Sequence, residues 1–362
     1  MVVKSSEGKA QRLTIDGKIQ QQLEAFISKR GQPIAAVVMV DVASGTIIAM
    51  AQGKEPEQWS HDPNGASTHT ALYSDFPAAS LFKTVTTAAL LEVGATAADK
   101  VRNLTGGCAE VNPQGSWLRD KAGKEGRNFT LEQAFAISCN GFFAQMAVKY
   151  LGLNVLSLYA SKFGWDGGIA TDFFLKQSPH VPPQPNSSSV GSVGKYAAGF
   201  GRVGISPMHA AWINLAIARD GVSLPLRVQD GSDKHALLNS AASERRLLSN
   251  EHSQQLRTLM HQTVIKGSAR GGFRSKKYLK IRELAGGKTG SLTGKSPKGR
   301  ITWFSGLMPY DNPQVVVSAV VVNSGAWQIR GSQLAAEALW LWYQEHWADN
   351  RIVPSMPRVA AQ

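Results

Sequence analysis

Apolar residues gather in β-type runs near both ends of the chain. Residues 35–42 (AAVVMVDV) and 45–52 (GTIIAMAQ) are rich in apolar and β-branched side chains, and they meet at Ser44-Gly45, a pair typical of a hairpin turn. Comparable runs return near the carboxyl end, over 284–291, 301–307 and 315–322. Both ends of the chain are therefore predicted to supply strands.

The middle of the chain has the spacing of helices. Apolar residues recur every three or four positions over 81–93, 131–137, 142–151 and 207–218. Terminal helices are predicted over 14–29, with Asp16 as the N-cap, and over 333–347. This order predicts an α+β fold: an antiparallel sheet built from both chain ends, flanked by terminal helices, with an inserted helical lobe. A groove between the two lobes is the expected place for a site.

The composition is that of a basic globular protein. Of the 362 residues, 43% are hydrophobic and 18% are charged, which excludes a disordered or fibrous chain. The net charge of +13 is concentrated in a basic window, residues 266–300, which holds eleven Lys or Arg and one acid, Glu283. Such a window indicates either a solvated face or an anion-binding surface. No nucleic-acid-binding motif accompanies it, so nucleic acid is not expected as a partner.

Targeting signals and metal motifs are both missing from this sequence. Residues 1–13 are polar and lack the apolar core of a signal peptide, and no stretch approaches the roughly 20 apolar residues of a membrane helix. Cys108 and Cys139 are too few for a disulfide framework and have no metal-ligand spacing. We therefore expect no metal and no cofactor.

Three short motifs occur in a fixed order: Ser80-Leu-Phe-Lys83, Ser138-Cys-Asn140 and Lys288-Thr-Gly290. The first opens a predicted helix, the second lies between two predicted helices, and the third falls on a predicted strand. A Ser-x-x-Lys pair alone carries no weight, but this order and context together resemble the penicillin-binding proteins and serine β-lactamases. The flanking segments 77–83, 199–221 and 303–306 also resemble the transpeptidase domain of penicillin-binding proteins.

The resemblance assigns a role to each motif residue. Ser80 would be the nucleophile, with Lys83 beside it on the helix as the base, once burial and the nearby Lys288 lower its pKa. Ser138 would relay a proton to the leaving nitrogen, and Asn140 would hold Lys83 and a substrate amide. Lys288 and Thr289 would bind the substrate carboxylate. Gly290, which has no side chain, would let the backbone come close. The N–H groups of Ser80 and Ser291 would form the oxyanion hole.

The resemblance extends from about residue 13 to about residue 347. It implies a polar, unstructured leader over 1–12, a transpeptidase domain over 13–350 and a tail over 351–362. Within the domain, the sheet lobe would span about 13–60 and 270–350, and the helical lobe about 61–269. Ala79 and Ser291 stand where the family more often has Gly and Thr. No membrane anchor, glycosyltransferase region or pedestal is present, so we expect the chain to be a piece of a longer protein.

The function implied is that of a peptidoglycan D,D-transpeptidase, acylated at Ser80 by D-Ala-D-Ala stem peptides and by β-lactams. A class D-like β-lactamase, a β-lactam sensor, a D,D-carboxypeptidase and a catalytically idle scaffold remain alternatives. The motif residues argue against the scaffold, and Asn140 stands where class D has Val. The family also implies proteins of a cell-wall synthesis complex as partners and the outer face of the bacterial cytoplasmic membrane (periplasm) as the location.

Two interpretations of the cysteines stay open. Cys139 lies between Ser138 and Asn140, where a small apolar side chain can simply fill space. Cys108 follows the glycine-rich Thr105-Gly-Gly, and a polar stretch then leads to Phe129, so this segment could fold back onto Cys139. In an oxidising compartment two thiols brought together this way form a disulfide.

Overall fold

A computed structural model provides the fold of this chain. It describes residues 2–4, 10–31, 33–54, 69–95, 101–104, 107–108, 111, 126–166, 168–184, 189–230, 244–295, 297–325 and 328–347. The predicted tail, 351–362, lies outside the described residues. Within the predicted leader, β1 (Val2–Lys4) and β2 (Ala10–Arg12) pair as antiparallel strands, so these two stretches do not match the unstructured leader that we expected.

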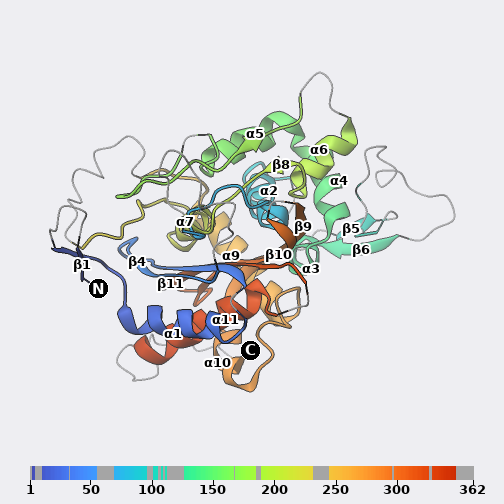
Figure 1. The fold of residues 1–362 in the computed structure, drawn as a ribbon. Helices are drawn as coiled ribbons and strands as arrows, with labels where there is room; N and C mark the ends of the chain where they lie inside the picture. Colours follow the sequence, from blue (N-terminus) through green and yellow to red (C-terminus); the bar gives the residue numbers. More distant parts are fainter. Residues whose placement is uncertain are drawn as a thin grey trace, which may run out of the picture.

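One antiparallel sheet is built from both chain ends, as predicted (Figure 1). Its strand order is β4-β3-β11-β10-β9, so a strand from the amino-terminal half pairs directly with one from the carboxyl end. In that pairing Ile34 lies opposite Val322. The strands are β3 (Ile34–Asp41), β4 (Ile47–Gln52), β9 (Gly286–Lys295), β10 (Lys298–Met308) and β11 (Val315–Asn323).

Both faces of this sheet are covered. Because successive side chains of a strand point to opposite faces, β3 divides its residues between two cores. Ala36, Val38 and Val40 pack toward the helical lobe. Ala35, Val37 and Met39 pack toward the terminal helices α1 (Gly17–Ser28) and α11 (Gly331–His346) (Figure 1). The continuous apolar runs seen in the sequence therefore belong to strands buried on both sides.

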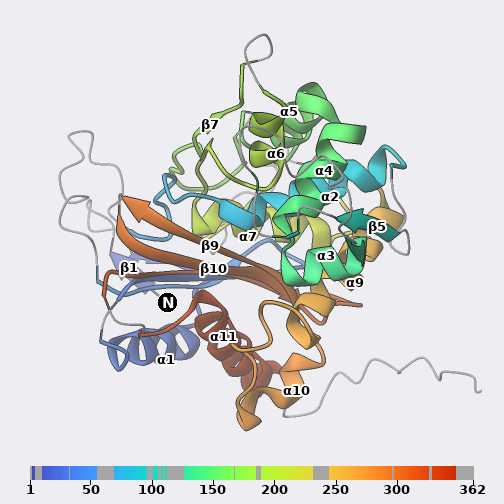
Figure 2. The ribbon, with the colours of Figure 1, turned by 90° about the vertical axis from the view of Figure 1, so that its right-hand side faces the viewer.

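The helical lobe lies on the other face of the sheet (Figure 2). Its centre is α7 (Pro207–Ala218), which is buried along its whole length and contacts β3, β10 and β11. The predicted helices correspond to α2 (Phe82–Glu92), α3 (Leu131–Ile137) and α4 (Asn140–Tyr150). Further elements that we did not predict are α5 (Gly152–Lys162), α6 (Val190–Ala197), α9 (Asn250–Ile265), α10 (Leu279–Arg282), η2 (Ala79–Leu81), η4 (Lys276–Tyr278), β5 (Val101–Leu104), β6 (Arg127–Thr130), β7 (His180–Val181) and β8 (Arg202–Val203).

The predicted N-cap of the first helix is confirmed, because the Asp16 carboxylate accepts from the backbone N–H groups of Lys18 and Ile19. Among the described residues, no helix is both long and apolar enough to cross a membrane. The domain limits at 13 and 350 remain a prediction. The layout as a whole, an α+β fold with a sheet lobe and a helical lobe, is confirmed.

Candidate active site

Ser80 lies in a tight turn that leads into α2. The turn is the 3₁₀ segment η2, and its first residue, Ala79, adopts a left-handed conformation with φ of 48°. A left-handed backbone disfavours a side chain, which explains why glycine is commoner at this position in the family that the sequence resembles. Lys83 lies on the first turn of α2, and its Nζ is 2.8 Å from Ser80 Oγ. The first motif therefore brings a hydroxyl and an amine into hydrogen-bond contact.

The second motif supplies three more oxygen partners to the same amine. Lys83 Nζ donates to the Ser138 carbonyl at 3.0 Å and to Ser138 Oγ at 3.2 Å, and it also contacts Asn140 Oδ1. Ser138 ends α3 with a left-handed φ of 63°, and Asn140 begins α4. The sharp change of direction between the two helices is what turns both oxygens of Ser138 toward Lys83.

Lys83 is completely buried, which changes its acid–base behaviour. Burial lowers its pKa well below the ordinary value of a lysine, and the charge of Lys288 lowers it further. Four oxygen atoms surround its Nζ, more than the three hydrogens of an ammonium can serve. In its neutral form the amine carries a lone pair, which can accept the hydroxyl hydrogen of Ser80.

The third motif lies on β9, the edge strand of the sheet beside η2. Lys288 is 1% exposed, and burial lowers its pKa to about 7. Its Nζ lies 5.4 Å from the centre of the Phe135 ring and donates to the Thr289 carbonyl at 3.1 Å. As the edge strand of the described sheet, β9 also offers backbone N–H groups that pair with no other described strand.

Gly290 and Ser291 follow on the same strand. Gly290 pairs with Trp303 of β10, whose indole Nε1 donates to the Pro77 carbonyl at 3.0 Å. Trp303 therefore ties the segment before Ser80 to the sheet next to β9. Ser291 is exposed at the same edge.

A serine outside the three motifs contacts the site. Ser268, in the turn after α9, hydrogen-bonds Thr289 through the two hydroxyl groups at 2.5 Å. Its backbone N–H donates to the Ala136 carbonyl at 2.9 Å, so the turn bridges α3 and β9. No local pattern marks Ser268 in the sequence, because the contact depends on a turn meeting a strand about 20 residues later.

Members of the basic window differ in their surroundings. Within it Lys288 is buried beside Lys83, whereas Lys266 pairs with Glu132 at 2.8 Å and Lys277 pairs with Glu337 of α11. Arg282 pairs with its neighbour Glu283. Lys288 is therefore the member of the window that is buried at the motifs, and a role for the window as a whole stays a prediction.

The two cysteines are bonded in the structure. Their Cα atoms are 4.5 Å apart, and the bond closes a loop of 31 residues. A backbone hydrogen bond also connects the two segments, because the Gly141 N–H donates to the Cys108 carbonyl at 3.2 Å. The disulfide thus attaches the segment at Gly107 and Cys108 to the turn that holds Ser138.

Comparison with known families agrees with this arrangement. The family model described as the penicillin-binding protein transpeptidase domain matches residues 35–339. The chain belongs to this family. That transpeptidase family is one of serine acyltransferases, which is the class that the motifs indicated.

The curated relatives are longer than this chain. "Peptidoglycan D,D-transpeptidase PbpA" of Mycolicibacterium smegmatis is 25% identical over 328 residues, which cover 80% of this chain and 62% of the relative. "Stage V sporulation protein D" of Bacillus subtilis is 26% identical over 353 residues, covering 91% and 52% respectively. The chain therefore spans between half and two thirds of the length of these relatives.

Solved transpeptidase structures share the fold. The D,D-transpeptidase domain of a peptidoglycan glycosyltransferase from Eggerthella lenta superposes with a TM-score of 0.72 at 20% identity, covering 95% of each chain. Penicillin-binding protein 3 of Mycobacterium tuberculosis, solved with aztreonam, gives 0.70 at 20% identity, covering 94% of this chain and 82% of that one.

Proposed function

We propose that this chain is a peptidoglycan D,D-transpeptidase whose nucleophile is Ser80. The observation that supports it most is the contact of Ser80 Oγ with Lys83 Nζ at 2.8 Å, made by an amine whose pKa burial and Lys288 both lower. A serine hydroxyl needs a base within hydrogen-bond reach, and an amine serves only in its neutral form. The contact meets the first condition, and the lowered pKa of Lys83 favours the second.

Acylation uses the three motifs together. The terminal carboxylate of a D-Ala-D-Ala stem peptide binds at Lys288 and Thr289. Lys83 takes the Ser80 proton as Oγ attacks the penultimate D-Ala carbonyl, and the N–H groups of Ser80 and Ser291 stabilise the negative oxygen. The proton then passes from Lys83 through Ser138 to the leaving nitrogen, and the last D-Ala departs as a free amino acid.

Deacylation repeats these steps with a new nucleophile. An amine of a neighbouring stem peptide attacks the acyl-enzyme, loses a proton to Lys83, and forms the cross-link as Ser80 regains its hydrogen. A β-lactam acylates Ser80 by the same route, but its ring opens without losing a leaving group. The ester that results remains on the serine.

The names of the relatives support the substrate class and the setting. The relative from Mycolicibacterium smegmatis is named a peptidoglycan D,D-transpeptidase, and a structural neighbour is in complex with the β-lactam aztreonam. We therefore propose peptidoglycan stem peptides as substrates, other cell-wall synthesis proteins as partners, and the outer face of the cytoplasmic membrane as the location.

The test is covalent labelling followed by turnover. Fluorescent penicillin should label the wild type and Ser189→Ala, in which an exposed helix-capping serine is lost, but not Ser80→Ala. Intact mass over time should show a stable adduct, whereas rapid loss of the adduct would indicate a β-lactamase. A stem pentapeptide supplied with an amine acceptor should yield the cross-linked product. Labelling that survives in Ser80→Ala would overturn the proposal.

A further inference from the structure

Two adjoining hollows lie where α1 ends and α11 begins, on the side of the sheet away from the helical lobe. Their volumes are about 250 Å³ and about 270 Å³, and both are lined by Gly271, Arg274, Ile329 and Gln333. The segment from Gly271 to Tyr278 forms one wall. Figure 2 shows the chain after α9, in orange, running down beside α11 to α10.

The lining of these hollows is cationic. Arg30 and Lys277 line the first hollow, Arg330 lines the second, and Arg274 lines both. No acidic side chain is among the described lining residues. Lys277 is already paired with Glu337, which leaves the guanidinium groups of Arg30 and Arg274 as the main source of positive potential.

Arg30 and Arg274 make no ion pair with any described carboxylate. The Arg30 guanidinium lies over the Phe26 ring, 4.9 Å from its centre, and both residues line the first hollow. Both arginines are therefore positioned for an anion that is not part of the described chain.

We propose that this paired hollow binds a phosphate group. Arginine presents its N–H donors in a flat fork that matches two phosphate oxygens at once, so several arginines around one cavity favour this anion. The Ser275 hydroxyl and the Gln328 amide add neutral donors to the lining. Each hollow is smaller than most pockets for organic ligands, which favours a headgroup or a small phosphorylated molecule.

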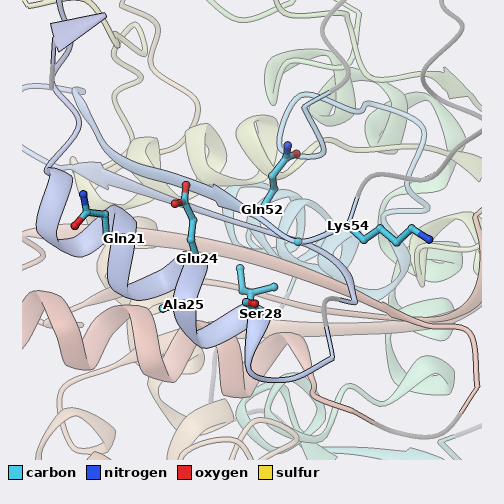
Figure 3. A pocket seen from close by; sticks show the side chains of 8 residues that line it. Gln21, Glu24, Ala25, Ser28, Gln52 and Lys54 are labelled. Atoms are coloured by element: carbon cyan, nitrogen blue, oxygen red, sulfur yellow. The ribbon is translucent and has the colours of Figure 1, made fainter.

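A larger hollow nearby shows that cavity size alone does not make such a site. It measures about 460 Å³ and lies between α1 and the end of β4 (Figure 3). Its lining combines the acid Glu24 with Lys54, and Figure 3 shows Lys54 pointing away from α1. With opposite charges at its rim, this hollow has no preference for anions. The proposal therefore depends on charge at the paired hollow.

The test compares two double variants that lose the same charge. Arg30→Gln/Arg274→Gln removes cations of the paired hollow. Arg127→Gln/Arg202→Gln removes two exposed arginines elsewhere, and Arg127, like Arg30, lies over an aromatic ring. Circular dichroism and thermal unfolding establish that both variants are folded. Measurements at about 0.15 M salt limit long-range attraction between the anion and the net charge.

The probes separate the two sources of phosphate. Inorganic pyrophosphate is titrated by calorimetry, and vesicles of equal parts phosphatidylglycerol and phosphatidylcholine are tested by co-sedimentation. Binding of either probe by the wild type and the control variant, weakened about tenfold or more in Arg30→Gln/Arg274→Gln, would support the proposal. Loss with pyrophosphate indicates a small phosphorylated ligand, and loss with vesicles alone indicates a lipid headgroup. Equal binding by all three proteins, or no binding by the wild type, would overturn it.

Discussion

Lys83 and Lys288 are the two residues whose chemistry departs furthest from that of an ordinary lysine. Both amines are buried, and each protonated form is disfavoured by loss of water; the charge of Lys288 adds to this effect at Lys83. A buried amine that must be charged to attract a carboxylate lowers the stability of the empty site. Under the proposed function, the carboxylate of the substrate would restore the missing counter-charge.

Lys288 should give the protein a measurable pH dependence of stability. Its pKa is about 7 when folded, whereas an unfolded lysine titrates near 10.4, so the unfolded chain binds the extra proton between these values. The free energy of unfolding of the wild type should therefore rise relative to that of Lys288→Met, by up to about 1.4 kcal/mol per pH unit from pH 7 toward pH 10. Urea unfolding of both proteins measures the difference.

Below about pH 7 the group is protonated in both states, and its contribution should become constant. Lys288→Met should be the more stable protein there, because it buries no charge. The matched control is Lys298→Met on the neighbouring strand, whose side chain is exposed and which should show no such slope. A parallel pH course for the wild type and Lys288→Met would contradict the lowered pKa.

Ser268 should act on acylation through Thr289. Ser268→Ala removes the 2.5 Å contact between the hydroxyls and should slow acylation by penicillin several-fold. In a Thr289→Val background the same substitution should have little effect, giving a coupling energy of about 1 kcal/mol in a double-mutant cycle. Stopped-flow acylation rates of the four proteins test this. Additive losses would mean that Ser268 acts independently of Thr289.

At the scale of elements, the turn before α2 depends on one glycine packed against it. A Cβ at Gly199 would lie 1.8 Å from the Ala79 carbonyl oxygen, and Gly199 has a φ of +89°. Gly199→Ala should therefore displace the Ser80 turn, lowering stability by several kcal/mol and slowing acylation.

Gly201 provides a control with the same backbone requirement. Its φ is +104°, but an added Cβ would meet no atom within 4 Å. Gly201→Ala should lose only the roughly 1–2 kcal/mol of a left-handed backbone and should keep its acylation rate. Urea unfolding and penicillin acylation of both variants distinguish the strain of a left-handed backbone from displacement of the Ser80 turn. Equal effects of the two substitutions would refute the packing argument.

The disulfide should stabilise the turn that holds Ser138. A loop of 31 residues corresponds to about 3–4 kcal/mol in the chain-entropy model. Reduction with dithiothreitol should lower the free energy of unfolding by an amount of this order and slow acylation, because Cys139 neighbours both Ser138 and Asn140. Cys108→Ser/Cys139→Ser should already show both losses and should not respond to reductant. Two free thiols in the unreduced, unfolded wild type would show that the bond does not form.

The elements differ in how well the sequence predicts them. The run 315–322 matches β11 within one residue, because a strand buried on both faces is apolar at nearly every position. α6 holds two glycines in eight residues, which removes the local preference for a helix. α9 is polar over most of its length, although Leu256, Leu259 and Met260 have helical spacing and Ser249 caps it. Its stability comes from packing against α3 and β9, which no local pattern reveals.

The residues of the candidate site also differ in how well the sequence predicts them. Its three motifs are predicted from their order and from the family resemblance, because the number of residues between them does not give their distance in space. Ser268 depends on a contact between segments separated in sequence, and no short pattern marks it; Gly199 lies in a segment that resembles the family, but its packing against Ala79 was not predicted. The burial of Lys288 was likewise invisible, because the surrounding sequence is strongly basic.

At the scale of the whole molecule, the two lobes meet along the sheet, and each supplies part of the site. The helical lobe carries Ser80, Lys83 and Ser138, whereas the sheet carries Lys288 and Thr289. α7 lies between them, buried against β3, β10 and β11. The relative position of the lobes therefore sets the distance between Ser80 on one side and Lys288 and Thr289 on the other, and core packing along α7 maintains it.

The pairing of β3 with β11 has a consequence during protein synthesis. A ribosome that has made the first half of this chain has released β3 and β4, but the strand that covers the other edge of β3 is still more than a hundred residues away. Until β11 emerges, that apolar edge remains open to pairing with other chains, the usual origin of aggregation. Because β9 is also synthesised long after α2, the nascent chain carries Ser80 well before it has the strand that completes the candidate site, and that site cannot assemble until β9 has been made.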